Sequence, residues 1–290
     1  MHAEEQEVAE PLVRALLGAQ FPEWAELTLT RIESFGTDHA IWRLGDELAL
    51  RFPRVEWAAE LPEREAAWLP LLAPHLPLPA PAPLATGVPG EGYPFHWSVV
   101  PWLPGRNVTE EEIDEREAAR TLASFVRALQ RVPPGGGPLS SRGGALQQRD
   151  RGTRAAIEVL GDKVDAAATT AAWERALAAP PWIGPPVWLH GDLLPGNLLA
   201  EDGRLTGVID FGFGLGVGDP AVELLPAWAL FSGESRELFR DGVGADEATW
   251  QRGRGWALSV ALIALPYYER TNPPLWRVMR RMFDAALGDD

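Results

Sequence analysis

Short apolar runs with strand-like patterns dominate the first hundred residues. Residues 27–32 and 47–52 alternate between apolar and polar side chains, and residues 40–44 are apolar and aromatic apart from Arg43. Such runs are typical of β-strands. The Gly45-Asp46 dipeptide separates the last two runs and predicts a tight hairpin turn. This pattern predicts an antiparallel sheet near the start of the chain.

Two helices and an extended segment complete the N-terminal part. Apolar residues at helical spacing predict helices over residues 4–17 and 57–72. Residues 74–83 contain five prolines and are expected to be extended, because proline fixes φ and lacks an amide hydrogen. Residues 93–102 predict a further strand, which leads into a linker at Pro104-Gly105.

From Thr109 onward the apolar positions take helical spacing. Thr109 and Glu112 form a capping-box pattern that predicts a helix toward Val132. Further helices are predicted over residues 153–160, 166–179, 220–231, 245–265 and 274–287. The expected fold class is therefore α+β, with a small β-rich part over residues 1–103 and a larger, mostly helical part over residues 104–290. A cleft between two such parts is a common place for a ligand.

Composition and charge narrow the classes of function. The chain is 46% hydrophobic and 23% charged, and it has no apolar run of membrane-spanning length. An acidic N-terminus without the layout of a signal peptide, and the absence of cysteine, lead us to expect a cytoplasmic protein, as a monomer or a dimer. The net charge of −15 disfavours nucleic acid as a partner. It fits a cationic small molecule, and it also fits plain solubility.

The residues that carry chemistry are concentrated between positions 187 and 212. Asp192, Asn197 and Asp210 each follow an apolar run or lie in a turn. The turn at residues 201–204 joins two apolar runs as a hairpin, so Asn197 and Asp210 can lie side by side. Phosphoryl transfer needs such a set: one carboxylate orients a hydroxyl nucleophile, while an amide and a second carboxylate hold Mg²⁺ on a nucleoside triphosphate.

Three motifs resemble those of one enzyme family. They are His190-Gly191-Asp192 with Asn197 five residues later, Ile209-Asp210-Phe211-Gly212, and Gly218-Asp219-Pro220-Ala221. In this combination and order they resemble the aminoglycoside phosphotransferase family. The resemblance extends from about Thr28 to the last helices. It implies a bilobal protein-kinase-like fold and transfer of phosphate from ATP or GTP to hydroxyl groups of small molecules.

The same resemblance assigns roles to the motif residues. Asp192 is expected to act as the catalytic base, and His190 to shape the catalytic loop. Asn197 and Asp210 are expected to bind Mg²⁺. Asp219 is expected to brace the catalytic loop through hydrogen bonds rather than to bind metal.

The nucleotide is expected to lie against the N-terminal part. Gly36 and Thr37 fall in a loop between two strands, where a phosphate-covering loop belongs, although the loop lacks a G-x-G-x-x-G motif. The third strand should carry a lysine for the α- and β-phosphates, but Lys163 is the only lysine among 26 lysines and arginines. Arg51 occupies that position instead. We expect it to serve the same purpose, because a guanidinium can also bridge phosphate oxygens.

Three further residues complete the predicted nucleotide site. Glu65 is the expected ion-pair partner of Arg51, with Glu60 and Glu63 as rivals. Val100 and Trp102 are expected to flank the base at the hinge. Main-chain groups usually read the base edge there, so the side chains do not decide between ATP and GTP.

Three other classes of protein could carry some of the same residues. A protein kinase needs a long activation loop, and fewer than ten residues separate Asp210 from Gly218. A metal-dependent hydrolase could use His190, Asp192, Asp210 and Asp219, but the spacing to Asn197 and the β-rich N-terminal part argue against it. A nucleotide-binding pseudoenzyme stays open because Arg51 replaces the usual lysine.

The acceptor is not determined by the sequence. An aminoglycoside or related antibiotic would suit the acidic chain and would make this a resistance enzyme. Macrolides, other sugars, amino alcohols and metabolites are alternatives. Candidate acceptor contacts, each of which could also be a surface or core residue, are Asp150, Glu158, Glu223 and Tyr267.

Overall fold

A computed structural model describes residues 5–33 and 38–288 of the chain. The N-terminal part contains an antiparallel sheet with the strand order β1-β2-β3-β5-β4. Its strands are β1 (Leu29–Ile32), β2 (His39–Leu44), β3 (Leu48–Pro53), β4 (Ala85–Gly87) and β5 (Trp97–Pro101). The predicted strands are confirmed, with ends shifted by at most four residues. Gly45 has a φ of 59°, which a tight turn between β2 and β3 requires.

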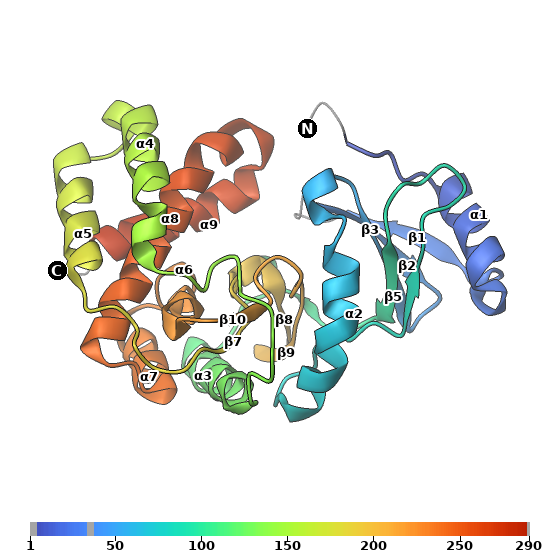
Figure 1. Cartoon of the computed structure of the whole chain (residues 1–290), viewed down its shortest axis with the longest axis horizontal. Helices are drawn as coiled ribbons and strands as arrows, with labels where there is room; N and C mark the ends of the chain where they lie inside the picture. The colour runs from blue at the N-terminus through green and yellow to red at the C-terminus, as the bar shows by residue number, and fades with distance from the viewer. Residues whose placement is uncertain (1–4, 34–37, 289–290) are drawn as a thin grey trace.

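One face of this sheet packs against α1 (Glu10–Gln20) (Figure 1). Phe52 and Trp97 stack at 4.8 Å between ring centroids in the core of this part, where Leu16 is also fully buried. The helix begins later than predicted because Pro11 favours the first helical turn. The helix also continues past Gly18, where we expected it to end. The buried side chains of Val13 and Leu17 hold the helix against the sheet.

Helix α2 (Leu61–Leu72) lies between the sheet and the helical part of the chain (Figure 1). The helix predicted over residues 57–72 is therefore divided, because a 3₁₀ turn over Glu56–Ala58 precedes α2 and Pro62 starts its first turn. The proline-rich segment that follows is largely extended, as predicted, after one 3₁₀ turn over Ala73–His75. The carbonyl of Pro79 accepts a hydrogen bond from Val208 and ties the segment to the C-terminal part.

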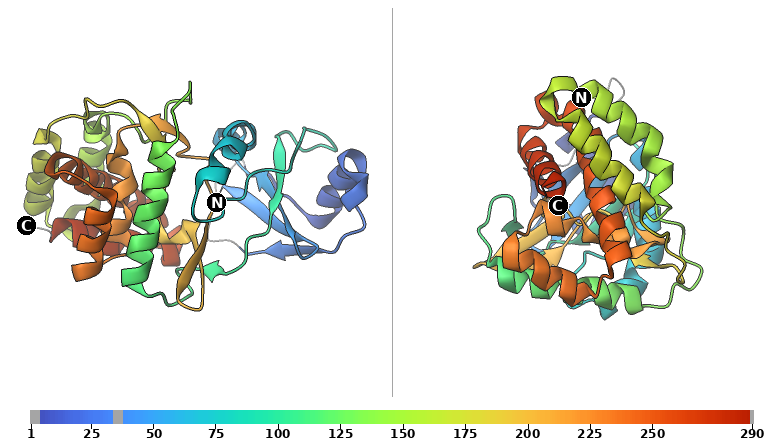
Figure 2. Two further views of the ribbon diagram at one scale, coloured as in Figure 1. Left: turned by 90° about the horizontal axis from the view of Figure 1, so that it is seen from below. Right: turned by 90° about the vertical axis from the view of Figure 1, so that its left-hand side faces the viewer.

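The C-terminal part is mostly helical. Its helices are α3 (Glu115–Arg131), α4 (Asp150–Leu160), α5 (Ala166–Ala178), α6 (Pro226–Ala229), α7 (Gly233–Val243), α8 (Glu247–Thr271) and α9 (Pro273–Leu287). Helix α8 runs through this part and packs against α4, α5 and α9, as the views in Figure 2 indicate. The core includes the fully buried rings of Phe125, Trp173, Trp228, Trp256 and Phe283. Among the described residues no helix is long and apolar enough to cross a membrane.

Two sequence-based helix limits are wrong, and one helix was not predicted. Asp114, not Thr109, caps α3, because its carboxylate accepts the amides of Arg116 and Glu117. Thr109 instead donates its hydroxyl to Asn107. Helix α8 continues past Pro266 as far as Thr271, and α7 was not predicted as a separate helix.

Short strands place the 187–212 block between the two parts. Strands β8 (Leu198–Glu201) and β9 (Arg204–Val208) form the predicted hairpin, and β6 (Arg106–Asn107) pairs with β8. Strand β7 (Val187–Leu189) pairs with β10 (Gly216–Gly218). The loops that leave β7 and β9 therefore start close together and face the N-terminal part.

Candidate active site

The β8–β9 hairpin brings Asn197 and Asp210 to the same end of two paired strands. Leu198 pairs with Val208, and one step beyond this pair the amide of Ile209 donates to the carbonyl of Asn197 at 2.9 Å. Asp210 follows directly and has a φ of 61°, a left-handed conformation that aspartate tolerates better than most residues. The 39% exposure of its side chain leaves the carboxylate accessible.

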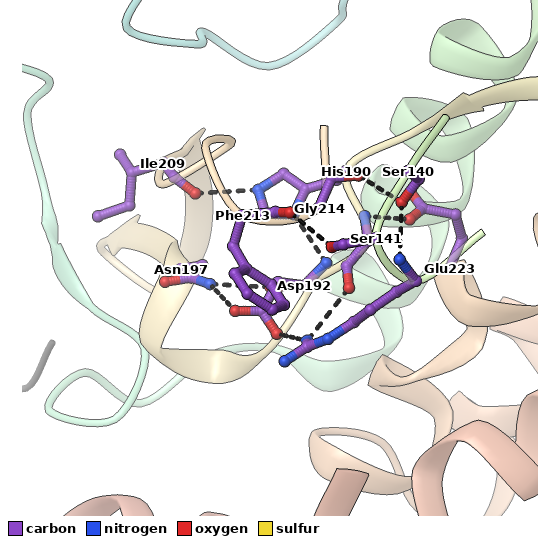
Figure 3. Close-up of polar contacts among 11 residues, drawn as sticks. Ser140, Ser141, His190, Asp192, Asn197, Ile209, Phe213, Gly214 and Glu223 are labelled. Carbon is purple, nitrogen blue, oxygen red and sulfur yellow. Dashed lines mark hydrogen bonds and ion pairs between the residues drawn. The ribbon is translucent and has the colours of Figure 1, made fainter. Parts of the chain in front are cut away.

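Asp192 lies next to Asn197 in the loop after β7 (Figure 3). The Asn197 amide nitrogen donates to the Asp192 carbonyl at 2.8 Å and to its Oδ2 at 3.2 Å. The amide nitrogen of Asn197 faces Asp192 in both bonds, so the Oδ1 atom of Asn197 remains available as an acceptor. Asp192 and Asn197 are thus joined directly, and the backbone bond between Ile209 and Asn197 places Asp210 next along the chain.

His190 is buried beneath this group and links the loop to β9. The Asp192 amide donates to His190 Nδ1 at 3.2 Å, so the ring proton resides on Nε2, which donates to the Ile209 carbonyl at 3.0 Å. Burial lowers the pKa of His190 and keeps the ring neutral. The ring also packs on Phe211 at 4.4 Å. His190 therefore holds the loop in place and does not line the cleft.

Glu223 anchors the same loop from the 3₁₀ turn over Pro220–Leu224. Its Oε1 accepts the Gly191 amide at 2.7 Å, and its side chain is fully buried. Burial raises the pKa of Glu223 to about 7, although the amides of Gly191 and His190 favour the ionised form. Glu223 was a candidate acceptor contact, and its burial contradicts that role. Asp219 was expected to brace the catalytic loop, but its carboxylate pairs with Arg252 at 2.7 Å. The carboxylate that accepts a hydrogen bond from the loop is that of Glu223.

Arg142 contacts Asp192 from the segment between α3 and α4, and the sequence analysis missed it. Its guanidinium donates to Asp192 Oδ1 and, at 3.2 Å, to the carbonyl of Gly191. It also lies 4.7 Å from the ring centroid of Phe213. Fifty residues separate Arg142 from Asp192, so no local spacing could have indicated the pair.

Two serines before Arg142 hold the segment after Asp210. The hydroxyl of Ser140 donates to the carbonyl of Gly214 at 2.6 Å, and that of Ser141 donates to the carbonyl of Phe213 at 2.7 Å (Figure 3). The segment that carries Arg142 is thereby fixed to the segment that follows Asp210.

Arg51 joins the two parts of the chain. On β3 it donates to Glu65 Oε2 of α2 at 2.5 Å and to Asp210 Oδ1 at 2.6 Å. Burial alone would lower the pKa of Arg51, but the two carboxylates raise it above its ordinary value, so the guanidinium stays charged. Burial acts to raise the pKa of Asp210, and the charge of Arg51 outweighs it, so this pKa lies below its ordinary value. Of the three glutamates considered as partners, Glu60, Glu63 and Glu65, it is Glu65 that contacts Arg51.

A cavity of about 340 Å³ lies between the sheet and the β8–β9 hairpin. Apolar side chains from both parts line it, namely Ile41, Ala49, Val100, Leu199 and Ile209. Arg51, Trp102, Asn197 and Asp210 also line it. His39 lies at its wall, and burial together with the charge of Arg51 lowers the pKa of His39 to about 3, so this ring is neutral. The cavity thus has an apolar lining and, where Arg51 pairs with Asp210, a charged end.

The remaining predicted residues lie elsewhere or outside the description. Gly36 and Thr37 are outside the described residues. Asp150 accepts the Trp173 indole at 2.7 Å and pairs with Arg154, so its carboxylate is used within the fold. Glu158 is exposed on α4.

The donor set fits a hard divalent cation such as Mg²⁺. The Asp210 carboxylate and the Asn197 Oδ1 are oxygen donors that line one cavity, and Mg²⁺ is commonly held by one or two protein groups together with phosphate oxygens. Within residues 5–33 and 38–288 no cluster of three or more histidine, cysteine or acidic side chains could hold a metal by itself. A metal at this position would therefore need oxygens from a bound ligand.

Comparison with known proteins gives a family and a set of similar folds. Residues 28–256 match the family described as "Phosphotransferase enzyme family". The GDP and kanamycin complex of APH(2")-IIia has a TM-score of 0.75 at 17% identity, covering 96% of this chain and 99% of that chain. Macrolide 2'-phosphotransferase MphH from Brachybacterium faecium has a TM-score of 0.65 at 24% identity, covering 97% and 99%.

A third similar structure contains both streptomycin and ATP. The streptomycin-ATP-APH(2")-IIa ternary complex has a TM-score of 0.61 at 15% identity, covering 97% of this chain and 99% of that chain. No curated protein sequence matches the chain.

Proposed function

Because the chain belongs to the phosphotransferase enzyme family, we propose that it transfers the γ-phosphate of a nucleoside triphosphate to a hydroxyl group of a small molecule. One observation carries the proposal: Asn197 and Asp210 line one cavity together with apolar side chains, and Asn197 is hydrogen-bonded to Asp192. The similar structures crystallised with GDP or ATP support a nucleotide as the phosphate donor.

The nucleotide would lie mainly against residues 1–103, and the catalytic loop belongs to residues 104–290. The apolar side chains Ile41, Ala49 and Leu199 would hold the base, beside Val100 and Trp102. Arg51 would contact phosphate oxygens at the charged end, where Glu65 fixes its guanidinium. Pairing with Glu65 keeps Arg51 charged and in place, so it can take the position expected of a lysine.

Asp192 would orient the acceptor hydroxyl and accept its proton as the phosphate is transferred. Its carboxylate is held at both oxygens, by Arg142 and Asn197, and this limits its rotation. His190 and Glu223 would act as positioning residues, because each contacts the backbone of the loop and is fully buried. A bound Mg²⁺, held by Asn197 and Asp210, would supply charge neutralisation for the phosphates.

The metal-dependent hydrolase is disfavoured. His190 is buried and uses both ring nitrogens within the fold, and Asp219 pairs with Arg252. The four residues that a hydrolase would need therefore do not converge on one open site.

An assay of nucleoside diphosphate release tests the proposal. ATP and GTP are supplied separately with Mg²⁺ and a panel of acceptors that includes aminoglycosides, macrolides, sugars and amino alcohols. Asp192→Asn should lower kcat by ~10³-fold, because a positioned general base contributes 10²–10⁴-fold, while the Kd of the nucleotide stays unchanged. Glu201→Asn, an exposed change in the β8–β9 turn, is the control.

Two results would contradict the proposal in different ways. Near-normal turnover by Asp192→Asn would remove Asp192 as the base. Nucleotide binding that depends on Mg²⁺, with no diphosphate release for any acceptor, would favour the pseudoenzyme.

A further inference from the structure

A second arginine lies beyond Arg142, and the proposed transfer does not use it. Arg142 and Asn197 contact different oxygens of Asp192, and neither Arg142 nor Arg149 lines the nucleotide cavity. Arg149 follows Arg142 by seven residues, at the end of the 3₁₀ turn over Leu146–Arg149, and the charge of Arg142 contributes to the lowered pKa of Arg149, so the two guanidinium groups lie near each other. The Asp192–Arg142 pair thus has a second cation beside it.

The side chain of Arg149 is held in a fixed position. Its Nε donates to Ser259 Oγ at 3.2 Å, and the guanidinium lies 5.5 Å from the ring centroid of Trp256. Ser259 is fully buried and also accepts a hydrogen bond from Thr153 at 2.8 Å. Ser259 and Trp256 both belong to α8, which runs through the helical part (Figure 1). The guanidinium is therefore oriented before any ligand binds.

Arg149 lacks a counter-charge. Over the described ranges, 5–33 and 38–288, no carboxylate lies within ion-pair distance of Arg149, and its two terminal nitrogens have no hydrogen-bond acceptor. Burial, and to a smaller extent the charge of Arg142, lower the pKa of Arg149. A half-buried cation without a partner is unfavourable, and contact with one aromatic face offsets only part of that cost. An anionic group would complete this environment.

We propose that Arg149, together with Arg142, forms an anion-binding subsite that holds a carboxylate or phosphate group of the acceptor whose hydroxyl faces Asp192. The inference rests on the proposed function, because it assigns the acceptor class of that same site. A guanidinium fixed at Nε presents its two terminal nitrogens as a fork, which matches the paired oxygens of a carboxylate or phosphate. The acceptor is thus a hydroxy compound that also carries an anionic group.

The overall acidity of the chain does not contradict an anionic acceptor. The net charge of −15 belongs to the whole surface, and charges more than about 8 Å away are largely screened at physiological ionic strength. Near the site, Asp38 and Asp192 are the acidic groups that influence Tyr268 of α8, and Arg142 acts on the same tyrosine. Since Arg142 already pairs with Asp192, Arg149 is the charge left for a ligand.

A labelling experiment tests the subsite without relying on turnover. The full chain is saturated with Mg²⁺ and a non-hydrolysable ATP analogue, so that phosphate-binding groups of the nucleotide site are occupied. Phenylglyoxal then modifies accessible arginines, and mass spectrometry of peptides measures the rate at each position. Inorganic phosphate or acetate should slow the labelling of Arg149 by about tenfold, the occupancy change expected at ten times Kd. Arg151, exposed two residues along, is the internal control.

A kinetic experiment identifies the acceptor class. Acceptors that share one sugar skeleton but differ in charge are compared: glucose, glucosamine, glucuronate and glucose 6-phosphate. The inference expects a lower KM for the two anionic sugars, and the ratio between them distinguishes carboxylate from phosphate. Arg149→Gln should raise the KM for the better anionic sugar by about tenfold, as for loss of one charged hydrogen bond, while the KM for the nucleotide stays constant. Arg151→Gln is the matched control.

The outcomes separate the two proposals. Equal labelling of Arg149 with and without anions, or a preference for glucosamine that Arg149→Gln does not change, would overturn the subsite and leave phosphoryl transfer intact. Anion protection of Arg149 in a protein that consumes no nucleotide with any acceptor would retain the subsite and contradict the proposed function.

Discussion

The buried carboxyl group of Glu223 should make the free energy of unfolding depend on pH. The substitution Glu223→Gln should remove this dependence. The pKa of the Glu223 carboxyl group is about 7, against 4.5 for an ordinary glutamate. Between these values the folded protein holds a proton that the unfolded chain has released. Stability linked to this group is therefore fully present below pH 4.5 and is lost as the pH rises toward 7.

The size of the effect follows from the interval between the two pKa values. Each pH unit in this interval lowers the free energy of unfolding by ~1.4 kcal/mol. The whole interval amounts to about 3 kcal/mol. Glu223→Gln keeps an oxygen that can accept the Gly191 amide but cannot ionise. The variant should therefore lie within ~1 kcal/mol of the natural protein at pH 5 and exceed its stability by up to ~3 kcal/mol at pH 8.5.

Denaturant unfolding followed by tryptophan fluorescence, at half-unit steps from pH 5 to pH 8.5, measures this difference. Glu223→Leu should be less stable than Glu223→Gln at every pH by about 1–3 kcal/mol, because the Gly191 amide then loses its acceptor. The exposed Glu201→Gln is the control for a general charge effect. A difference between the natural protein and Glu223→Gln that does not change with pH would refute the reasoning.

The remaining predictions concern the contacts that hold the catalytic segments. Arg51→Ala leaves the Glu65 and Asp210 carboxylates without their shared cation and should lower the free energy of unfolding by about 3–5 kcal/mol, measured with denaturant. Unchanged stability would contradict a shared pair. Gly214→Ala would place a Cβ against the carbonyl of His190, so kcat should fall by ~10-fold or more while the Kd of the nucleotide changes little. His190→Phe keeps a ring but donates no hydrogen bond, and it should lower kcat more than it raises that Kd; equal effects on both would argue against a positioning role.

Much of the site can be found from sequence because its central part is local. Asp192 and Asn197 lie in one loop, and a hairpin brings Asn197 to Ile209 and thus next to Asp210. Hairpins leave recognisable turn residues and alternating patterns, so the spacing alone predicted that these side chains converge. The assignment of their roles stays a prediction until the variants are measured.

Helix limits were harder to predict because competing local signals look alike in a sequence. Thr109 and Asp114 both precede helical patterns, and only the observed hydrogen bonds select Asp114 as the cap. Pro266 was expected to end a helix, but the turns before it are buried, and packing there outweighs one missing backbone hydrogen bond.

The sequence by itself determined the family resemblance, the α+β class and the local group of Asp192, Asn197 and Asp210. Apart from the Arg51–Glu65 pair, the tertiary structure alone decided which charged side chains meet. Arg51 reaches Asp210 across 159 residues, Arg142 reaches Asp192 across 50, and Glu223 reaches Gly191 across 32. Such contacts leave no spacing signal, because they arise where separate elements pack together. These contacts are needed because the groups are buried. A charge removed from water is stable only beside an opposite charge or a hydrogen-bond partner, and the fold determines which residue provides it.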